Sequence, residues 1–128
     1  MKYVYPAIFT PVDGEFAVKV PDLPGCRTCG KDLAEAIAMA EDAVSMWLWD
    51  AENKKEEIPT PSAPPAVEAP SFCNYVMADT DAYRRQYDNR AVKKTLTIPS
   101  WLNVQAEQAG INFSQTLQAA LKQQLGIQ

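Results

Sequence analysis

The clearest alternation of apolar and polar residues lies in residues 92–98. Side chains on a strand point to opposite faces at successive positions, so this run predicts a β-strand. Its two faces would be Val92, Lys94, Leu96 and Ile98 on one side, and Lys93, Thr95 and Thr97 on the other. Pro99 ends the strand because proline has no amide hydrogen for a sheet. No neighbouring run is an obvious hairpin partner, so we expect antiparallel pairing with the same strand of a second copy.

Two short helical patterns follow this strand. Ser100 is a favourable N-cap for the first helix, and Gly110 suits its end. Asn112 precedes the second helix, with Gln115 at the capping-box offset. Apolar residues recur at helical spacing in both: Trp101, Leu102, Val104 and Ala109, then Phe113, Leu117, Ala120, Leu121 and Leu125. Residues 92–128 are therefore expected to form one small dimerising domain.

The first half of the chain predicts a small antiparallel sheet with one helix. Four short runs are the expected strands: residues 2–10, 16–20, 26–29 and 72–77. Pro6 indicates an edge position or a bulge, and Asp13-Gly14 is a strong turn signal. Asp32 with Glu35 predicts the start of a helix whose apolar positions then recur at helical spacing. The fold class is α+β.

Charge is unevenly distributed along the chain, whose net charge is −4. Residues 1–78 hold 6 Lys and Arg against 12 Asp and Glu, a net of −6, whereas residues 79–128 hold 6 against 4, a net of +2. This asymmetry suggests a basic protein partner for the front and nucleic acid for the back. No run reaches the roughly 18 apolar residues of a membrane span, and the N-terminus lacks a signal peptide's apolar core. We therefore expect a cytoplasmic protein without a membrane partner.

Candidate chemistry is sparse. Histidine is absent, which excludes histidine acid–base catalysis and histidine metal ligands within the chain. Cys26 and Cys29 form one CxxC pair, and with only Cys73 besides they fall short of the four ligands of a zinc site. We therefore expect no catalytic residue, no metal and no cofactor.

Residues 92–126 resemble the ribbon–helix–helix family of DNA-binding dimers. A two-stranded ribbon fits the DNA major groove, and the resemblance implies that its outward side chains read bases. It also places a phosphate at the start of the second helix, where free amides and the helix dipole attract anions. The implied base-reading residues are Lys93, Thr95 and Thr97, and the phosphate-binding residues are Asn112, Phe113 and Ser114. The alternative is a dimerisation hairpin that binds no nucleic acid.

The front half resembles the HicB antitoxin family. The resemblance rests on the order and spacing of residues 5–9, 16–18 and 21–26, then Thr28, Gly30, Glu35 and Ala36. It implies a partial RNase H-like fold of order βββαβ. It also implies an antitoxin, not an enzyme, that masks a HicA-type mRNA-cleaving toxin sterically. With the ribbon–helix–helix end, it implies repression of the protein's own operon by a homodimer, or a higher oligomer, bound to operator DNA.

Residues 51–71 are rich in proline, alanine, serine and threonine, and predict an exposed, semi-stiff connection. By composition this stretch could link two domains. The family architecture instead returns residues 72–77 to the first sheet, which makes 51–71 a long loop inside a front domain of residues 1–78. Residues 79–91 would then be a hinge with a brief helix capped by Asp79 or Thr80.

The roles of four other residues stay open. Arg84 and Arg85 either contact the DNA backbone, as Lys94 could, or lie on a solvated helix face. Trp49 lies on a different side of the front helix from Trp47. It is either an exposed anchor for the toxin or packs against another element.

Two other classes of function compete with this prediction. One is a ribbon–helix–helix transcription factor whose front domain senses a small molecule, which the lack of a glycine-rich phosphate loop weakens. The other is a metal-dependent nuclease, because nucleases of the RNase H fold gather several carboxylates around two metal ions. Here Asp13, Glu15 and Asp22 lie on or beside turns, without an obvious fourth carboxylate.

Overall fold

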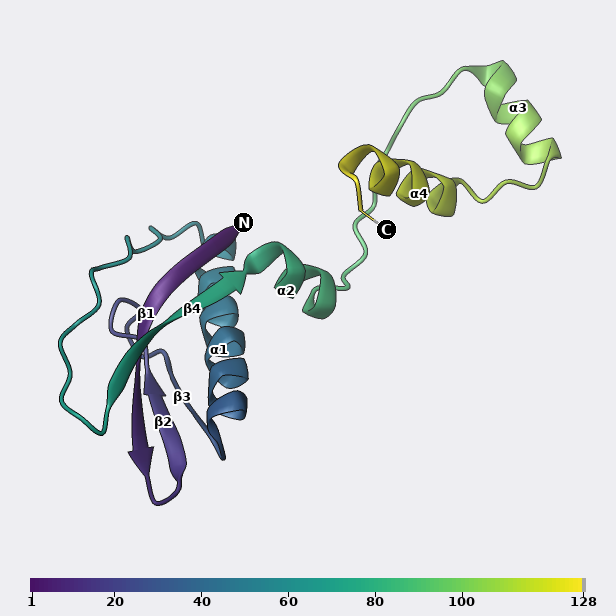
Figure 1. The fold of residues 1–128 in the computed structure, drawn as a ribbon. Helices are drawn as coiled ribbons and strands as arrows, with labels where there is room; N and C mark the ends of the chain where they lie inside the picture. Colours follow the sequence, from purple (N-terminus) through teal and green to yellow (C-terminus); the bar gives the residue numbers. More distant parts are fainter. Residues whose placement is uncertain (128) are drawn as a thin grey trace. The chain divides into compact units, whose positions relative to one another are not determined.

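The computed structural model describes residues 1–127 as two compact units, the first running from Met1 to Arg90 and the second beginning at Ala91 (Figure 1). The division falls after helix α2 (Thr80–Tyr87), which belongs to the first unit. The sequence predicted that this helix belongs to a hinge over residues 79–91. It belongs to unit 1 instead, because it packs against helix α1 (Leu33–Asn53). Asp79, one of the two predicted caps, is its N-cap residue.

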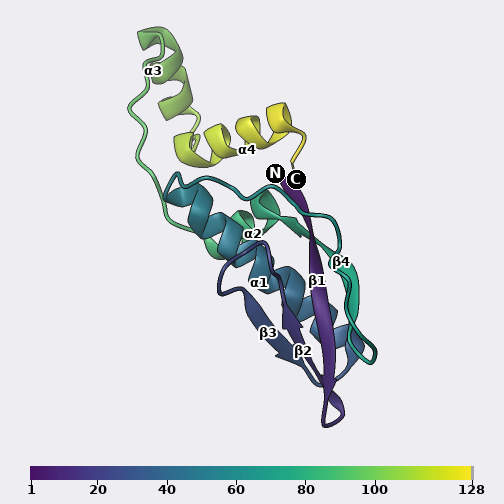
Figure 2. The ribbon, with the colours of Figure 1, turned by 90° about the vertical axis from the view of Figure 1, so that its left-hand side faces the viewer.

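Unit 1 contains a four-stranded antiparallel sheet with the strand order β3-β2-β1-β4 (Figure 2). Its strands are β1 (Lys2–Val12), β2 (Glu15–Lys19), β3 (Arg27–Gly30) and β4 (Phe72–Asp79). Asp13 and Gly14 both have the positive φ that a tight two-residue hairpin needs. The predicted α+β class and the βββαβ order are confirmed, including the return of the last strand to the first sheet.

Pro6 lies where the sheet is locally two-stranded. β1 pairs with β4 from Lys2 to Phe9, but with β2 only from Ile8 to Val12. Because β2 does not reach Pro6, the position has a neighbouring strand on one side only. The predicted edge position therefore holds locally, although β1 as a whole is a central strand.

Helix α1 (Leu33–Asn53) covers one face of the sheet, and the core lies between the two. The Asp32 carboxylate accepts a hydrogen bond from the Glu35 amide at 2.8 Å, as the capping pattern predicts. Alternate residues of β1 and β4 meet the helix because side chains on a strand alternate between faces. The largest fully buried apolar side chains are Tyr5, Phe9, Leu23, Val44, Leu48 and Val76.

The sheet and the helix approach each other closely at Gly30. A Cβ atom at this position would lie 2.3 Å from the backbone nitrogen of Ala36. We expect Gly30→Ala to lower the free energy of unfolding by about 1–3 kcal/mol, the usual cost of overpacking, in chemical denaturation. Cys29→Ala, at an exposed neighbour in β3, is the control and should change it by less than about 0.5 kcal/mol. Equal effects of the two substitutions would contradict a tight contact at Gly30.

The proline-rich connection between α1 and β4 stays within unit 1. It is shorter than predicted, because α1 continues through residues 51–53. Most of it is exposed, as predicted, but hydrogen bonds attach it at three points to β1 and to the loop between β2 and β3. These attachments are the Tyr5 hydroxyl to the Pro59 carbonyl, Ser62 to the Asp22 carboxylate at 2.6 and 2.9 Å, and Ser71 to Thr10 at 3.0 Å.

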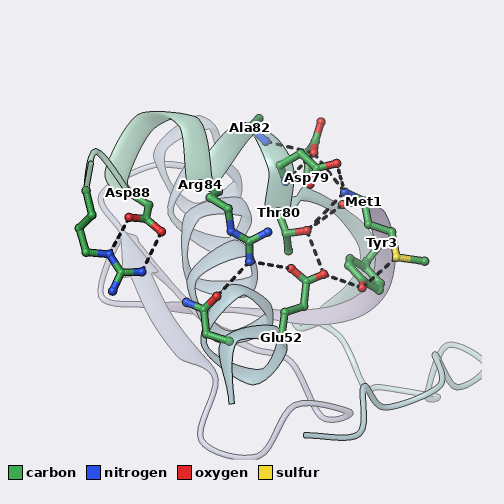
Figure 3. A network of polar contacts seen from close by, with 11 residues as sticks. Met1, Tyr3, Glu52, Asp79, Thr80, Ala82, Arg84 and Asp88 are labelled. Atoms are coloured by element: carbon green, nitrogen blue, oxygen red, sulfur yellow. Dashed lines mark hydrogen bonds and ion pairs between the residues drawn. The ribbon is translucent and has the colours of Figure 1, made fainter. Parts of the chain in front are cut away.

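A carboxylate at the end of α1 contacts two residues of α2 (Figure 3). Glu52 accepts hydrogen bonds from the hydroxyls of Tyr3 at 2.9 Å and Thr80 at 3.1 Å. Its other oxygen lies 3.4 Å from the guanidinium of Arg84. Burial and the neighbouring Glu52 carboxylate raise the pKa of Tyr3 from 10.0 to about 12, so this hydroxyl stays a donor even above its usual pKa. The contacts explain why α2 is part of unit 1.

Unit 2 contains two helices, α3 (Ser100–Gln108) and α4 (Phe113–Leu125). Gly110 and Gly126 follow them with the left-handed φ that suits a helix C-terminus. Residues 91–99 belong to neither a helix nor a strand in this single chain. A strand needs hydrogen bonds to a neighbouring strand, so the pairing of this segment with a second copy stays a prediction.

The two helix starts in unit 2 differ in how well the sequence predicted them. At α4, the Asn112 side chain accepts a hydrogen bond from the Gln115 amide at 3.0 Å, as predicted. At α3, the prediction of Ser100 as the N-cap is wrong. Pro99 holds that position, and its carbonyl accepts a bond from the Asn103 amide, so Ser100 already lies inside the helix.

Candidate functional site

An apolar groove of about 530 Å³ runs through unit 2 between residues 94–98 and α4. The segment contributes Lys94, Leu96 and Ile98 to this groove, which are the residues predicted to share one face. The opposite set does not line it and is exposed: Lys93, Thr95 and Thr97. Helix α4 contributes Phe113, Ser114, Thr116, Leu117 and Ala120. The segment therefore already separates its apolar side from its basic and hydroxyl side.

Unit 2 leaves its apolar side chains largely uncovered. None of residues 91–127 is buried. Val92 is 78% exposed, Leu96 61% and Trp101 63%. Many exposed large apolar side chains in one small unit indicate an interaction site. The surface includes the face of 92–98 that the sequence assigned to a dimer.

The N-terminus of α4 presents two backbone amides. The Gln115 and Thr116 amides are bonded to Asn112, through its side chain and its carbonyl respectively. Within residues 1–127, the amides of Phe113 and Ser114 have no protein acceptor. Free amides at a helix start, together with the helix dipole, suit a phosphate oxygen. The three predicted phosphate-binding residues are thus together, with Asn112 acting as the cap.

The three cationic residues with open roles lie in different places. The Arg84 guanidinium contacts Glu52 and the Asn53 side chain oxygen, the latter at 3.1 Å, so it stabilises unit 1. Arg85 is exposed on the same helix. Lys94 borders the groove of unit 2. Lys94 thus belongs to a different unit from the two arginines.

Trp49 packs between helices α1 and α2. Its ring lies 5.6 Å from that of Tyr83, tilted by 52°, and the residue is half-buried. Its indole N–H is buried and has no acceptor among the described residues. This placement favours the packing alternative over an exposed anchor. Trp47, by contrast, donates its N–H to the Pro24 carbonyl at 3.0 Å.

The cysteines and turn carboxylates differ in their surroundings. Cys26 is buried, which raises the pKa of its thiol, and Cys29 is exposed. The Asp22 carboxylate is occupied by Ser62. Within residues 1–127, no three of the residues that commonly bind metals form a group able to hold an ion. In the same range, no helix combines the length and apolar character that crossing a bilayer requires.

The arrangement is that of a binding protein built from an acidic sheet unit and a basic helical unit. The family described as "HicB_like antitoxin of bacterial toxin-antitoxin system" matches residues 5–121. The chain therefore belongs to the HicB-like antitoxins, as its sequence indicated, and antitoxins of this kind are non-enzymatic regulatory proteins.

Solved structures and a sequence relative extend this match. A chain of the "Toxin-Antitoxin complex from Streptococcus pneumoniae" is 28% identical with a TM-score of 0.61, covering 97% of this chain and 99% of that one. The Burkholderia pseudomallei antitoxin HicB is similar in fold, with 20% identity, a TM-score of 0.51 and 96% of both chains covered. A 14.9 kDa protein from the rep–hol intergenic region of Haemophilus phage HP1 is 27% identical over 100 residues, which is 77% of this chain and 75% of that protein.

Proposed function

We propose that this antitoxin covers the active surface of a HicA-type, mRNA-cleaving toxin and represses its own operon by binding operator DNA as a dimer. The observation that carries the DNA-binding part is the two-sided character of residues 92–98. Their apolar side borders an open groove, and Lys93, Thr95 and Thr97 lie on the other side. A second copy pairing along this segment would cover the apolar side and leave one basic surface outside.

The charge of unit 2 supports contact with nucleic acid. From Ala91 onward the chain has 3 Lys and Arg and 1 Asp or Glu, a net of +2 for each copy. Two copies would place two Lys93 side chains and four threonine hydroxyls on one ribbon, which suits base edges in the major groove. The Phe113 and Ser114 amides of each copy would hold a flanking phosphate.

The charge of unit 1 supports a basic protein partner. Residues 1–90 hold 9 Lys and Arg against 15 Asp and Glu, a net of −6. A protein that binds and cleaves RNA needs a basic surface, and opposite charges would speed its encounter with unit 1. The Streptococcus pneumoniae neighbour comes from a toxin–antitoxin complex and matches nearly the whole chain. Inhibition would be steric, because the antitoxin only has to occupy the surface that RNA needs.

We expect Lys93→Ala to weaken operator binding, because a good base contact is worth about 1–3 kcal/mol in each half-site. A gel-shift titration with DNA from upstream of the gene measures this. Lys122→Ala is the matched control: it removes the same charge, but from the last turn of α4. Unchanged binding by the Lys93 variant would refute the assignment of the ribbon's outer face.

Toxin neutralisation is tested with a small HicA-type protein, for which we expect a short basic reading frame beside this gene. Co-expression should restore growth that the small protein alone arrests, and the two chains should co-purify. RNA cleavage by the small protein should stop when the antitoxin is added. If the two chains do not associate, or the complex still cleaves RNA, the proposed antitoxin mechanism fails.

A further inference from the structure

Strand β4 forms an open edge of the sheet in unit 1. It pairs with β1 on one side, and among residues 1–127 no strand pairs with its other side. Natural edge strands are commonly protected by lysine, proline or a bulge, because an open edge can pair with another chain. The eight residues of β4 include neither lysine nor proline. An unprotected edge of this length can accept an added strand.

Two hydrogen bonds show which amides point to the open side. The Thr80 amide donates to the Met1 carbonyl, so the even-numbered positions of this strand face β1. The Tyr75 amide instead donates to its neighbour's side chain, Asn74 Oδ1, at 2.9 Å. Inward and outward amides alternate along an antiparallel strand, so the amides of Cys73, Tyr75 and Met77 face outward. Pro6 fits this register, because it is opposite Tyr75, where no bond between the two strands is required.

The open edge borders an acidic groove of about 470 Å³ between β4, α1 and α2. Glu41 and Asp42 of α1 and Asp79 of β4 line it, against a single cation, Lys2. Met77, which is 57% exposed, lies at the same groove, and the whole unit carries a charge of −6. An occupant would need an extended backbone for the edge and a positive side chain for the groove.

We propose that an extended basic segment of the toxin adds to the free edge of β4 and places a lysine or arginine beside Glu41 and Asp42. This inference rests on the proposed function and names the surface that performs it. A second copy of this chain is a poorer occupant, because β4 contains no lysine or arginine to place in the groove. Pairing of two β4 strands would instead bring together two units that each carry a net charge of −6.

A proline at position 77 separates edge pairing from side-chain contact. Met77→Pro removes an outward amide and keeps the bonds to β1, since proline is tolerated on the open side of an edge strand. Met77→Ala removes the side chain and keeps the amide. We expect Met77→Pro to bind the HicA-type toxin at least about tenfold more weakly than Met77→Ala, measured by calorimetry. Circular dichroism and thermal melting show whether both variants keep the wild-type fold.

Charge reversal tests the groove without touching the strand. Glu41→Lys with Asp42→Lys changes two exposed residues of α1 and should slow association with the toxin, most strongly at low salt. Glu35→Lys with Asp50→Lys reverses the same charge elsewhere on that helix and should have a smaller effect. In hydrogen exchange, the amides of Tyr75 and Met77 should become protected in the wild-type complex.

The outcomes distinguish this inference from the proposed function. If the wild-type complex forms but those amides stay unprotected and the two position-77 variants bind equally, edge pairing is wrong and the antitoxin proposal stands. If Met77→Pro instead alters only the oligomeric state, the edge joins copies of this chain and the inference is overturned. If the wild-type chain does not bind the toxin at all, both proposals fail.

Discussion

A chain that ends after Arg90 should lose operator binding completely and keep toxin binding with nearly unchanged affinity. Every residue that we assign to base or phosphate contact lies beyond this point. Every buried residue among residues 1–127 lies before it, so the core of unit 1 stays complete. A gel shift with operator DNA and calorimetry with the toxin measure the two activities on the same preparation.

The matched control is a fragment that ends after residue 78, the boundary suggested by the sequence. It lacks Asp79 and α2, and with them the contacts of Thr80 and Arg84 to Glu52. We expect its melting temperature to lie at least about 5 °C below that of the longer fragment, because a loss of 1 kcal/mol shifts a domain of this size by roughly 4–8 °C. If the Arg90 fragment folds but no longer binds the toxin, unit 2 takes part in toxin recognition and the division of roles is wrong.

Local signals in the sequence predicted the parts of the fold that depend on neighbouring residues. Asp32 with Glu35, and Asn112 with Gln115, mark helix starts because the cap and the amide it accepts are three residues apart. Asp13-Gly14 marks a hairpin because few residues adopt the backbone conformation it needs. The return of β4 to the sheet came from the resemblance to HicB antitoxins, since no local pattern specifies it.

Contacts between distant segments were not predictable in this way. The packing of α2 on α1 depends on Glu52 meeting Thr80 and Arg84, and on Trp49 meeting Tyr83. These residues come from opposite sides of the proline-rich connection, and their spacing in the sequence carries no periodic signal. The domain boundary was therefore placed before α2 instead of after it. The prediction of Ser100 as an N-cap failed because a local preference for serine did not decide where α3 begins.

The candidate sites show the same difference between local patterns and contacts of distant segments. The two faces of residues 92–98 follow from alternation alone, and the groove in unit 2 is consistent with them. The open edge of β4 was missed, because which amides face outward depends on the register between β1 and β4. Glu41 and Asp42 carried no signal either, since two acidic residues on a helix ordinarily indicate only its wet side.

Leu96→Glu should abolish both the dimer and operator binding. In the proposed dimer Leu96 leaves water, and a carboxylate in its place would lose the burial of a large apolar side chain and bring an unpaired charge into the interface. We expect the dissociation constant of the dimer to rise at least about a hundredfold, since burial of a leucine alone is worth roughly 1.5–3 kcal/mol. Sedimentation at several protein concentrations measures it. Unit 1 should be unaffected, so the toxin should still bind.

Thr95→Glu is the control, because it introduces the same side chain one position away and on the opposite face. We expect this variant to remain dimeric, since Thr95 points away from the groove. It should nevertheless lose operator binding, because a carboxylate on the ribbon's outer face would be held against DNA phosphates and base acceptors. A dimeric Leu96→Glu variant, or a Thr95→Glu variant that binds the operator as well as the wild type, would show that residues 92–98 do not form the proposed ribbon. Comparing adjacent positions thus separates assembly of the DNA-binding unit from its contact with DNA.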